Sequence, residues 1–145
     1  MKEPLLISAC FVGENCKYSG GNNYTPVVEQ LKDRYELIPV CPERDGGLST
    51  PRECSERTGD RVISKSGVDV TEQFVRGAEI ALKAAVRCGC KKALLKERSP
   101  SCGSGGIYDG TFTGTLVSGD GIAAQLLRKN GITIYGESSI NELMR

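Results

Sequence analysis

Short apolar runs separated by helix-like segments restrict the fold of this chain more than any other feature of its sequence. Four runs are typical of buried strands, at 4–10, 35–41, 92–96 and 132–135. Apolar residues at helical spacing lie between and after them, at 26–34, 71–88, 120–129 and 140–144. Because strands that alternate with helices pair in parallel and carry helices on both faces, the sequence predicts an α/β three-layer sandwich with a mainly parallel, Rossmann-like sheet.

Cysteines follow three of these predicted strands. Cys10 ends the first, Cys41 ends the second, and Cys102 lies in the loop just beyond the third. Ligands of open α/β sheets gather outside the carboxyl ends of the strands. We therefore expect three thiols that are far apart in the sequence to meet at one edge of the sheet.

The middle of the chain carries the clearest local signals. Asp69 and Glu72 can form a capping box at the start of the longest predicted helix, and Gly89 can end it. Before this helix, 61–63 and 68–70 flank a Ser-Lys-Ser-Gly turn. This pattern predicts a hairpin between those two segments.

The cysteine and histidine content narrows the chemistry. The chain has seven cysteines and no histidine. Without imidazole there is no Ser-His-Asp triad, no Cys-His pair and no Cys2His2 zinc site, so proton transfer falls to carboxylates, Lys, Tyr or water. An odd number of cysteines in a domain large enough to fold unaided argues against a disulfide framework. Metal ligation by thiolates becomes the question that the sequence poses.

Length and charge set the expected organisation and partners. The 145 residues suit one domain, spanning 1–145, and the 19 Lys+Arg against 18 Asp+Glu lack the basic excess that nucleic-acid binding needs. No apolar run approaches the roughly 20 residues of a membrane span, and the first residues are too few and too acidic for a signal peptide. We expect a cytoplasmic protein with a small-molecule substrate, and neither a nucleic acid polymer nor a membrane as partner.

Three thiolates at one edge can hold three irons of a cubane cluster, since proteins bind Fe-S clusters chiefly through cysteine. The fourth iron is then an open Lewis-acid position that matches soft thiocarbonyl or hydrosulfide sulfur. A single cysteine at a strand end is by default a small core residue. Three such positions at one edge favour ligands.

Neighbouring residues suit the same chemistry. Glu43, two residues after the second cysteine, can act as general acid or base, and Ser101, beside Cys102, can orient water or donate a hydrogen bond. Lys96 or Arg98 can attract an anion, although charges at a strand end are usually solvated. Glycines that would let backbone amides approach a sulfide or an anion follow Cys102, at 103, 105 and 106.

Several blocks of sequence carry a family resemblance that runs from about residue 5 to 135. They are Leu6-Ile7-Ser8-Ala9-Cys10, Gly13-Glu14-Asn15-Cys16-Lys17-Tyr18, Pro39-Val40-Cys41-Pro42-Glu43, Gly46-Gly47-Leu48, Pro51-Arg52, 96–103, 107–112 and Gly119-Asp120-Gly121. In these blocks the chain resembles the thiouracil desulfurase-like family, whose characterised members convert 2-thiouracil to uracil with a 4Fe-4S cluster.

The resemblance implies a 4Fe-4S desulfurase that acts on a carbon-sulfur bond without net electron transfer. Carried over by motif, Cys10, Cys41 and Cys102 are the cluster ligands, with one iron open to substrate sulfur. Glu43 and Ser101 match the positions for proton transfer and water activation. Proteins that assemble Fe-S clusters or accept sulfur are the partners that such an enzyme would have.

The other cysteines have weaker signals. Cys16 lies in a matched block, where a fourth ligand, a sulfur-relay thiol and a loop-packing role all remain open. Cys88 and Cys90 flank Gly89 at a predicted helix end, which favours a structural role, and Cys54 belongs to no matched block.

Two other functions remain open. A non-catalytic Fe-S sensor or a sulfur carrier would use the same cysteines, and substrate-dependent sulfide release separates it from an enzyme. A thiol redox protein built on Cys10 and Cys16 would work without iron and lose its function in Cys16→Ser.

Overall fold

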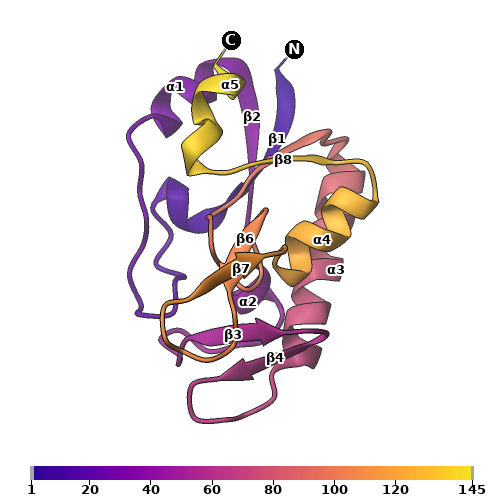
Figure 1. Ribbon diagram of the computed structural model, residues 1–145. Coiled ribbons are helices and arrows are strands. Elements are labelled where there is room, and N and C mark those ends of the chain that lie inside the picture. Colours follow the sequence, from indigo (N-terminus) through magenta and orange to yellow (C-terminus); the bar gives the residue numbers. More distant parts are fainter. Residues whose placement is uncertain (1, 145) are drawn as a thin grey trace.

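The computed structural model describes residues 2–144 and confirms the α/β prediction. Its main sheet has four parallel strands in the order β2-β1-β5-β8 (Figure 1). The strands are β1 (Glu3–Ser8), β2 (Tyr35–Val40), β5 (Lys92–Leu94) and β8 (Thr133–Tyr135). The chain runs from β1 to β2 on one side and then returns past β1 to β5, so the direction of winding reverses between β1 and β5. Such a switch point leaves a crevice at the carboxyl ends of the strands.

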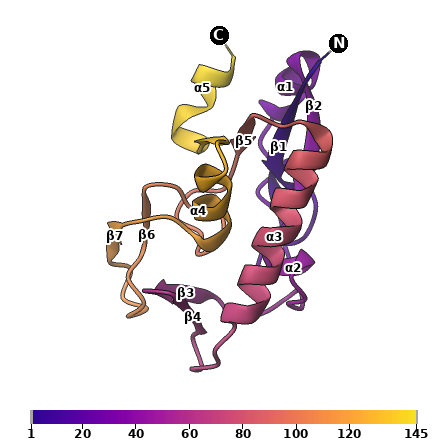
Figure 2. The ribbon, with the colours of Figure 1, turned by 90° about the vertical axis from the view of Figure 1, so that its right-hand side faces the viewer.

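Helices cover both faces of this sheet. One face carries α1 (Val28–Arg34) and α5 (Ile140–Leu143), and the other carries α3 (Thr71–Cys88) and α4 (Ile122–Lys129). Figure 2 shows α3 and α4 in front of the strands. Short 3-10 helices follow β1 and β8, as η1 (Ala9–Val12) and η2 (Glu137–Ser139). No helix within residues 2–144 is long and apolar enough to cross a bilayer.

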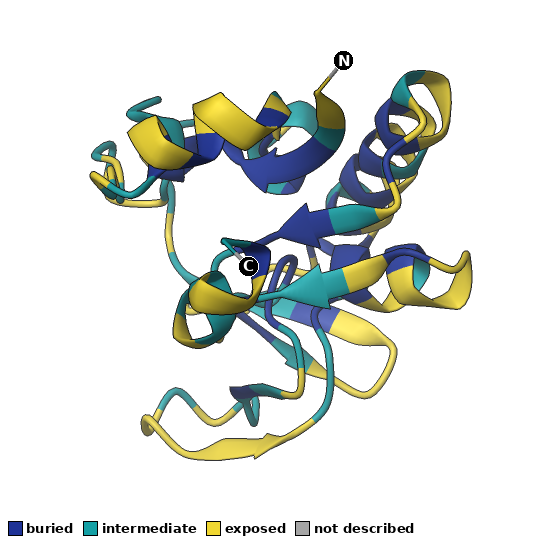
Figure 3. Cartoon of the chain, turned by 90° about the horizontal axis from the view of Figure 1, so that it is seen from above, coloured by how far each residue is buried: buried dark blue, intermediate teal, exposed yellow. Residues whose placement is uncertain are grey.

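The pleat of β1 divides the core in two. Leu5 and Ile7 pack with the residues of α1 and α5, whereas Leu6 packs with those of α3 and α4. All three are fully buried. In Figure 3 the inner strands are buried while the outer surfaces of the helices are exposed, as expected for a three-layer sandwich.

The long helix α3 has the boundaries that its sequence predicts. Asp69 accepts a hydrogen bond from the Thr71 amide (2.9 Å), and Gly89, with φ 74°, ends the helix in the left-handed conformation. Glu72 pairs instead with Arg76 (3.4 Å). The predicted capping box between Asp69 and Glu72 does not form, because Asp69 binds the Thr71 amide and the helix begins after Val70.

Two antiparallel hairpins lie beyond the carboxyl edge of the main sheet (Figure 1). One consists of β3 (Ser55–Thr58) and β4 (Arg61–Ser64), and the other of β6 (Gly106–Tyr108) and β7 (Leu116–Ser118). They close over the end of the crevice that the strand order creates.

The predicted hairpin between 61–63 and 68–70 forms, although as a single antiparallel bridge between Ile63 and Asp69 rather than as a full pair of strands. The Val70 amide donates to the Val62 carbonyl (2.9 Å), and the Ser64 amide donates to the Val68 carbonyl (2.8 Å). Residues 61–64 also pair with 55–58, through a tight turn at Gly59 (φ 59°). This second partner, 55–58, was not expected, because it reads Ser-Glu-Arg-Thr and has no apolar alternation that would indicate a strand.

A four-residue helix, α2 (Pro42–Asp45), follows β2 and was not expected from the sequence. Its backbone touches that of α3. A Cβ atom on Gly77 would lie 1.7 Å from the Pro42 carbonyl oxygen, and one on Gly46 would lie 2.0 Å from the Gln73 oxygen. The two glycines therefore permit a close approach that fixes the residues after β2.

Candidate active site

The three cysteines that follow strands line one cavity of about 470 Å³ at the carboxyl edge of the sheet. Cys10 lies in η1 directly after β1, Cys41 lies between β2 and α2, and Cys102 lies in the turn between β5 and β6. All three side chains are buried. Three separate elements thus bring three thiols to the crevice that the strand order predicts.

Burial controls the ionisation of these thiols. It raises the pKa of Cys102 to about 12, although hydrogen bonds from Ser8 and Ser101 partly offset the effect. It also raises the pKa of Cys10, while a hydrogen bond from the Asn23 amide (3.3 Å) lowers it. The charge of a Cys41 thiolate raises both values further. Both shifts favour the protonated thiols of Cys10 and Cys102, so a metal that binds these two residues must displace their protons.

Cys16 is a fourth buried thiol in the same cavity. Burial, followed by the neighbouring Cys41, raises its pKa to about 12. The Cys41 thiol donates a hydrogen bond to the Cys16 carbonyl oxygen (3.7 Å). Reactive redox cysteines have lowered pKa values. The raised values of Cys10 and Cys16 do not favour a thiol redox pair.

Glu43 and Ser101 lie against each other at the cavity wall. The Ser101 hydroxyl donates to Glu43 Oε2 (3.0 Å) and contacts the Cys102 sulfur (3.7 Å). Glu43 stands in the first turn of α2, and Ser101 is buried in the loop after β5. The structure therefore places a carboxylate and a hydroxyl beside a thiol, at 58 residues' separation in the sequence.

Ser99 shapes the turn that carries Ser101 and Cys102. Its hydroxyl accepts hydrogen bonds from the amides of both residues, at 3.1 Å each. The first amides of α4 donate to carbonyl oxygens of the same turn, including Ala123 to Ser101 (2.9 Å). A Cβ on Gly121 would lie 2.6 Å from that oxygen. The turn is thus seated on the start of α4.

Lys96 and Arg98, the two residues that the sequence suggested could attract an anion, differ in their ion pairing. Lys96 Nζ pairs with Glu137 (3.0 Å), so its charge is compensated. Arg98 lines the cavity and forms no ion pair within the described residues. Its φ of 68° is uncommon for a residue with a side chain.

The glycines after Cys102 do not serve as expected. The Gly103 amide donates to the Ser99 carbonyl (2.9 Å), and the Gly105 amide donates to Asp120 Oδ1 (2.8 Å). Gly106 belongs to β6. Since these groups are used within the protein and none of the three glycines lines the cavity, the expectation of an amide cradle for an anion is wrong.

Some cavity residues have no sequence signal that assigns them a role. Asn23 lies in a run of turn formers, and Arg52 lies in a matched block but had no predicted function. Cys54, expected to be incidental, also lines the cavity. Cys88 and Cys90 do not, since they lie at the other end of the sheet, before β5 begins.

The donor set fits a cluster better than a single metal ion. Among residues 2–144, no three Cys, Asp or Glu side chains converge closely enough to hold one ion. Thiolates that bind different irons of a cluster need not converge on one point. Three buried thiols from three elements, around a cavity of this size, match that requirement.

Comparison with known proteins agrees with this geometry. A family model described as 2-thiouracil desulfurase matches residues 5–139. The uncharacterised protein YbbK of Bacillus subtilis (strain 168) is 37% identical over 150 residues, which cover 97% of this chain and 99% of YbbK. The solved structure of the 4Fe-4S-dependent thiouracil desulfidase TudS is 43% identical, with a TM-score of 0.92 over 99% of this chain and 96% of TudS. The chain belongs to the 2-thiouracil desulfurase family.

Proposed function

We propose that this chain is an iron-sulfur enzyme that removes sulfur from a thiolated pyrimidine, converting 2-thiouracil to uracil and sulfide without net electron transfer. The observation that carries the proposal is the meeting of three strand-exit thiols with a hydrogen-bonded carboxylate and hydroxyl in one cavity. The name of the TudS structure, at 43% identity, supports both the cluster and the reaction.

The proposed cluster ligands are Cys10, Cys41 and Cys102. Each follows a different strand, so three separate elements of the fold would each supply a ligand to one iron of the cubane. When bound, a cluster with three cysteine ligands supplies an open iron, a Lewis-acid position for soft sulfur. The remaining chemistry then falls to the side chains of the cavity.

Glu43 and Ser101 are the proposed proton-transfer pair. Hydrolysis of a thiocarbonyl requires that water lose a proton as it attacks carbon. The Ser101 hydroxyl can orient that water, and Glu43 Oε2 can take up the proton through the 3.0 Å hydrogen bond. The departing sulfur is protonated by the same route in reverse. No imidazole is needed, in agreement with the absence of histidine.

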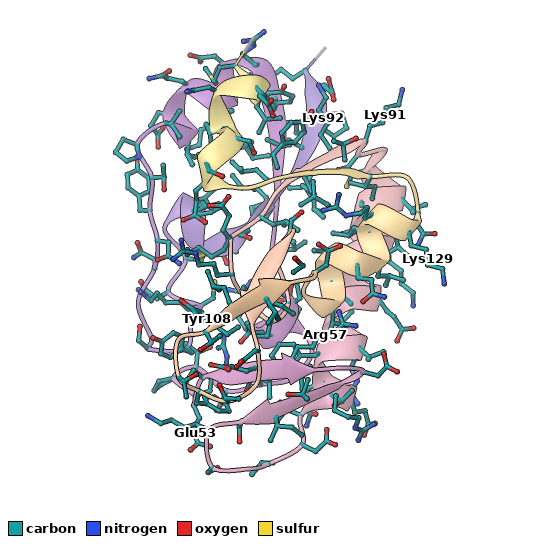
Figure 4. The ribbon with its side chains drawn as sticks, viewed as in Figure 1. Glu53, Arg57, Lys91, Lys92, Tyr108 and Lys129 are labelled. Atoms are coloured by element: carbon teal, nitrogen blue, oxygen red, sulfur yellow. The ribbon has the colours of Figure 1, made fainter. Side chains whose placement is uncertain are left out.

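Tyr108 is suited to hold the pyrimidine ring. It comes from β6 (Figure 4) and lines the cavity together with Tyr18 from the loop after Cys16. Aromatic side chains bind flat heterocycles by stacking. A planar, weakly polar substrate therefore fits this wall better than an extended one.

The sensor and sulfur-carrier alternatives are not favoured. A cluster that only senses or carries needs ligands but no carboxylate beside them. Here Glu43 is bound to the hydroxyl next to Cys102. The solved relative is described as a desulfidase.

Product analysis tests the proposal. Protein reconstituted without oxygen should convert 2-thiouracil to equal amounts of uracil and sulfide, with no added reductant or oxidant. A double variant, Cys88→Ser and Cys90→Ser, provides a matched control in which two cysteines outside the cavity are removed. Sulfide formation that requires a reductant, or none at all with a full cluster, would contradict the proposed reaction.

A further inference from the structure

Arg52 uses its whole guanidinium group inside the protein, next to the cavity. Its Nε donates to Glu43 Oε1 (3.1 Å) and its Nη2 donates to the Cys16 carbonyl (2.9 Å). Its Nη1 donates to the Ser49 carbonyl (3.2 Å) and to Thr50 Oγ1 (3.0 Å). The side chain is only 8% exposed. A buried cation with this many fixed contacts is held in a single orientation.

These contacts give the two oxygens of the Glu43 carboxylate different hydrogen-bond partners. Arg52 occupies Oε1, and Ser101 donates to Oε2 at 3.0 Å. Glu43 itself stands on a helix of four residues, whose backbone alone leaves a long side chain free to choose several rotamers. Ser99 also donates to Oε2 (3.4 Å), so the two serines fix one oxygen of the carboxylate and Arg52 fixes the other.

The same guanidinium fixes a second wall of the cavity. The Cys16 carbonyl that accepts from Arg52 also accepts from the Cys41 thiol. The Arg52 amide donates to the Tyr18 carbonyl (2.8 Å), so the segment is joined to the loop by its backbone as well. Arg52 thus links the loop after η1 to helix α2, which carries Glu43.

We propose that Arg52 is a positioning residue for the proposed desulfurisation, since it holds Glu43 Oε2 against Ser101 and keeps the Cys16 loop at the cavity wall. This inference rests on the proposed function for its catalytic meaning. The hydrogen bonds of the Arg52 side chain go to Glu43 and to carbonyl and hydroxyl oxygens rather than to a cysteine sulfur, so Arg52 acts through Glu43. Misplacing a reacting group by about 1 Å can lower the rate about a hundredfold.

The main test is Arg52→Ala, with Arg57→Ala as the matched control. Arg57 also donates to backbone carbonyls, those of Gly59 (2.8 Å) and Asp120 (2.7 Å), but lies outside the cavity. For anaerobically reconstituted Arg52→Ala we expect normal iron, kcat lowered about a hundredfold and KM changed by less than about threefold. Millimolar guanidinium should restore kcat at least about tenfold by filling the vacated position.

Arg52→Lys separates geometry from charge. A lysine keeps the positive charge but cannot bind Glu43 and Cys16 in the same fork, so kcat should remain low in this variant. A kcat of Arg52→Ala within about twofold of the wild type, at normal iron content, would overturn the proposal. Equal losses in Arg52→Ala and Arg57→Ala, or no rescue by guanidinium, would also overturn it.

A readout in the metal-free protein makes the inference independent of activity. The carboxyl 13C resonance of Glu43 is identified as the one that disappears in Glu43→Gln. It should shift in Arg52→Ala and stay unchanged in Arg57→Ala. An unchanged resonance in Arg52→Ala would overturn the positioning role even if a variant bound no cluster. Failure of the wild type to release sulfide would instead defeat the proposed function and leave this spectral test in force.

Discussion

Two groups of cysteines lie at opposite edges of the same sheet and differ in what surrounds them. Cys10, Cys41 and Cys102 line a cavity beyond the carboxyl ends of the strands, whereas Cys88 and Cys90 lie where α3 leads into β5. Both groups contain buried thiols. Only the first has several elements converging on a cavity, with a carboxylate hydrogen-bonded close by. Burial alone therefore does not distinguish a ligand thiol from a core thiol.

The largest expected contrast is between Cys102→Ser and Cys90→Ser. The first should lose most of its iron after anaerobic reconstitution and at least about a hundredfold in turnover, because a ligand is removed. Cys90→Ser should retain both. Iron and acid-labile sulfide per chain, measured with turnover, check the prediction. A full cluster and full activity in Cys102→Ser would show that the two groups do not differ as proposed.

The second contrast concerns the carboxylate beside the cavity thiols. Glu43→Gln keeps the shape of the side chain and an oxygen for Ser101, but it cannot take up a proton. We expect normal iron content and a kcat lowered by about 10²–10⁴. Glu53→Gln is the control, since Glu53 is exposed and outside the cavity (Figure 4). Unchanged turnover in Glu43→Gln would remove Glu43 from the proton-transfer step.

The third prediction concerns how the alkylation rate of Cys90, a cysteine outside the cavity, depends on pH. Burial raises the pKa of Cys90 to about 11, with smaller contributions from Cys88 and Glu36. Only the thiolate reacts with iodoacetamide, and below the pKa its fraction grows tenfold for each pH unit. Alkylation of Cys90, followed by peptide mass spectrometry in Cys88→Ser, should therefore accelerate about a hundredfold from pH 7 to pH 9. An ordinary exposed thiol, with a pKa of about 8.5, would accelerate only about 25-fold over the same range, and that result would contradict the prediction.

The smallest expected effect concerns the ring-binding wall. Tyr108→Leu keeps an apolar side chain but removes the aromatic face, so KM for 2-thiouracil should rise about tenfold with iron content unchanged. Tyr108→Phe keeps the face and should stay within about twofold. Steady-state kinetics of both variants separate the two cases. Equal KM values for Tyr108→Leu and Tyr108→Phe would mean that stacking does not hold the substrate.

The sequence predicted correctly those helices and strands whose formation depends only on residues near to one another in the chain. Apolar spacing and Gly89 were sufficient for α3, because both act within a few residues. The strand Ser55–Thr58 depends on distant partners instead. Glu56 accepts hydrogen bonds from the amides of Gly110 (2.9 Å) and Phe112 (3.1 Å), more than fifty residues away. No local pattern encodes such a strand, so the sequence predicted the partner segment at 68–70 but missed the strand at 55–58.

The candidate site likewise contains some features that a local sequence pattern predicts and others that depend on tertiary packing. A cysteine after each strand is a local pattern, and the rule for carboxyl edges brings the three thiols together. The contact of Glu43 with Ser101 depends on how α2 packs on α3 and how the turn at Ser99 is seated on α4. The fork of Arg52 depends on three segments at once. The local pattern of a cysteine after each strand therefore indicated the three proposed ligands, but no local pattern could indicate Arg52.

The central claim is that the cavity thiols hold an iron-sulfur cluster and that Cys88 and Cys90 do not. Iron, zinc and acid-labile sulfide per chain, measured after anaerobic reconstitution of the wild type and of the variant without Cys88 and Cys90, test it most directly. We expect about four irons and about four sulfides per chain in both proteins, the content of one cubane cluster. Zinc alone, no metal, or loss of iron from the double variant would contradict the claim.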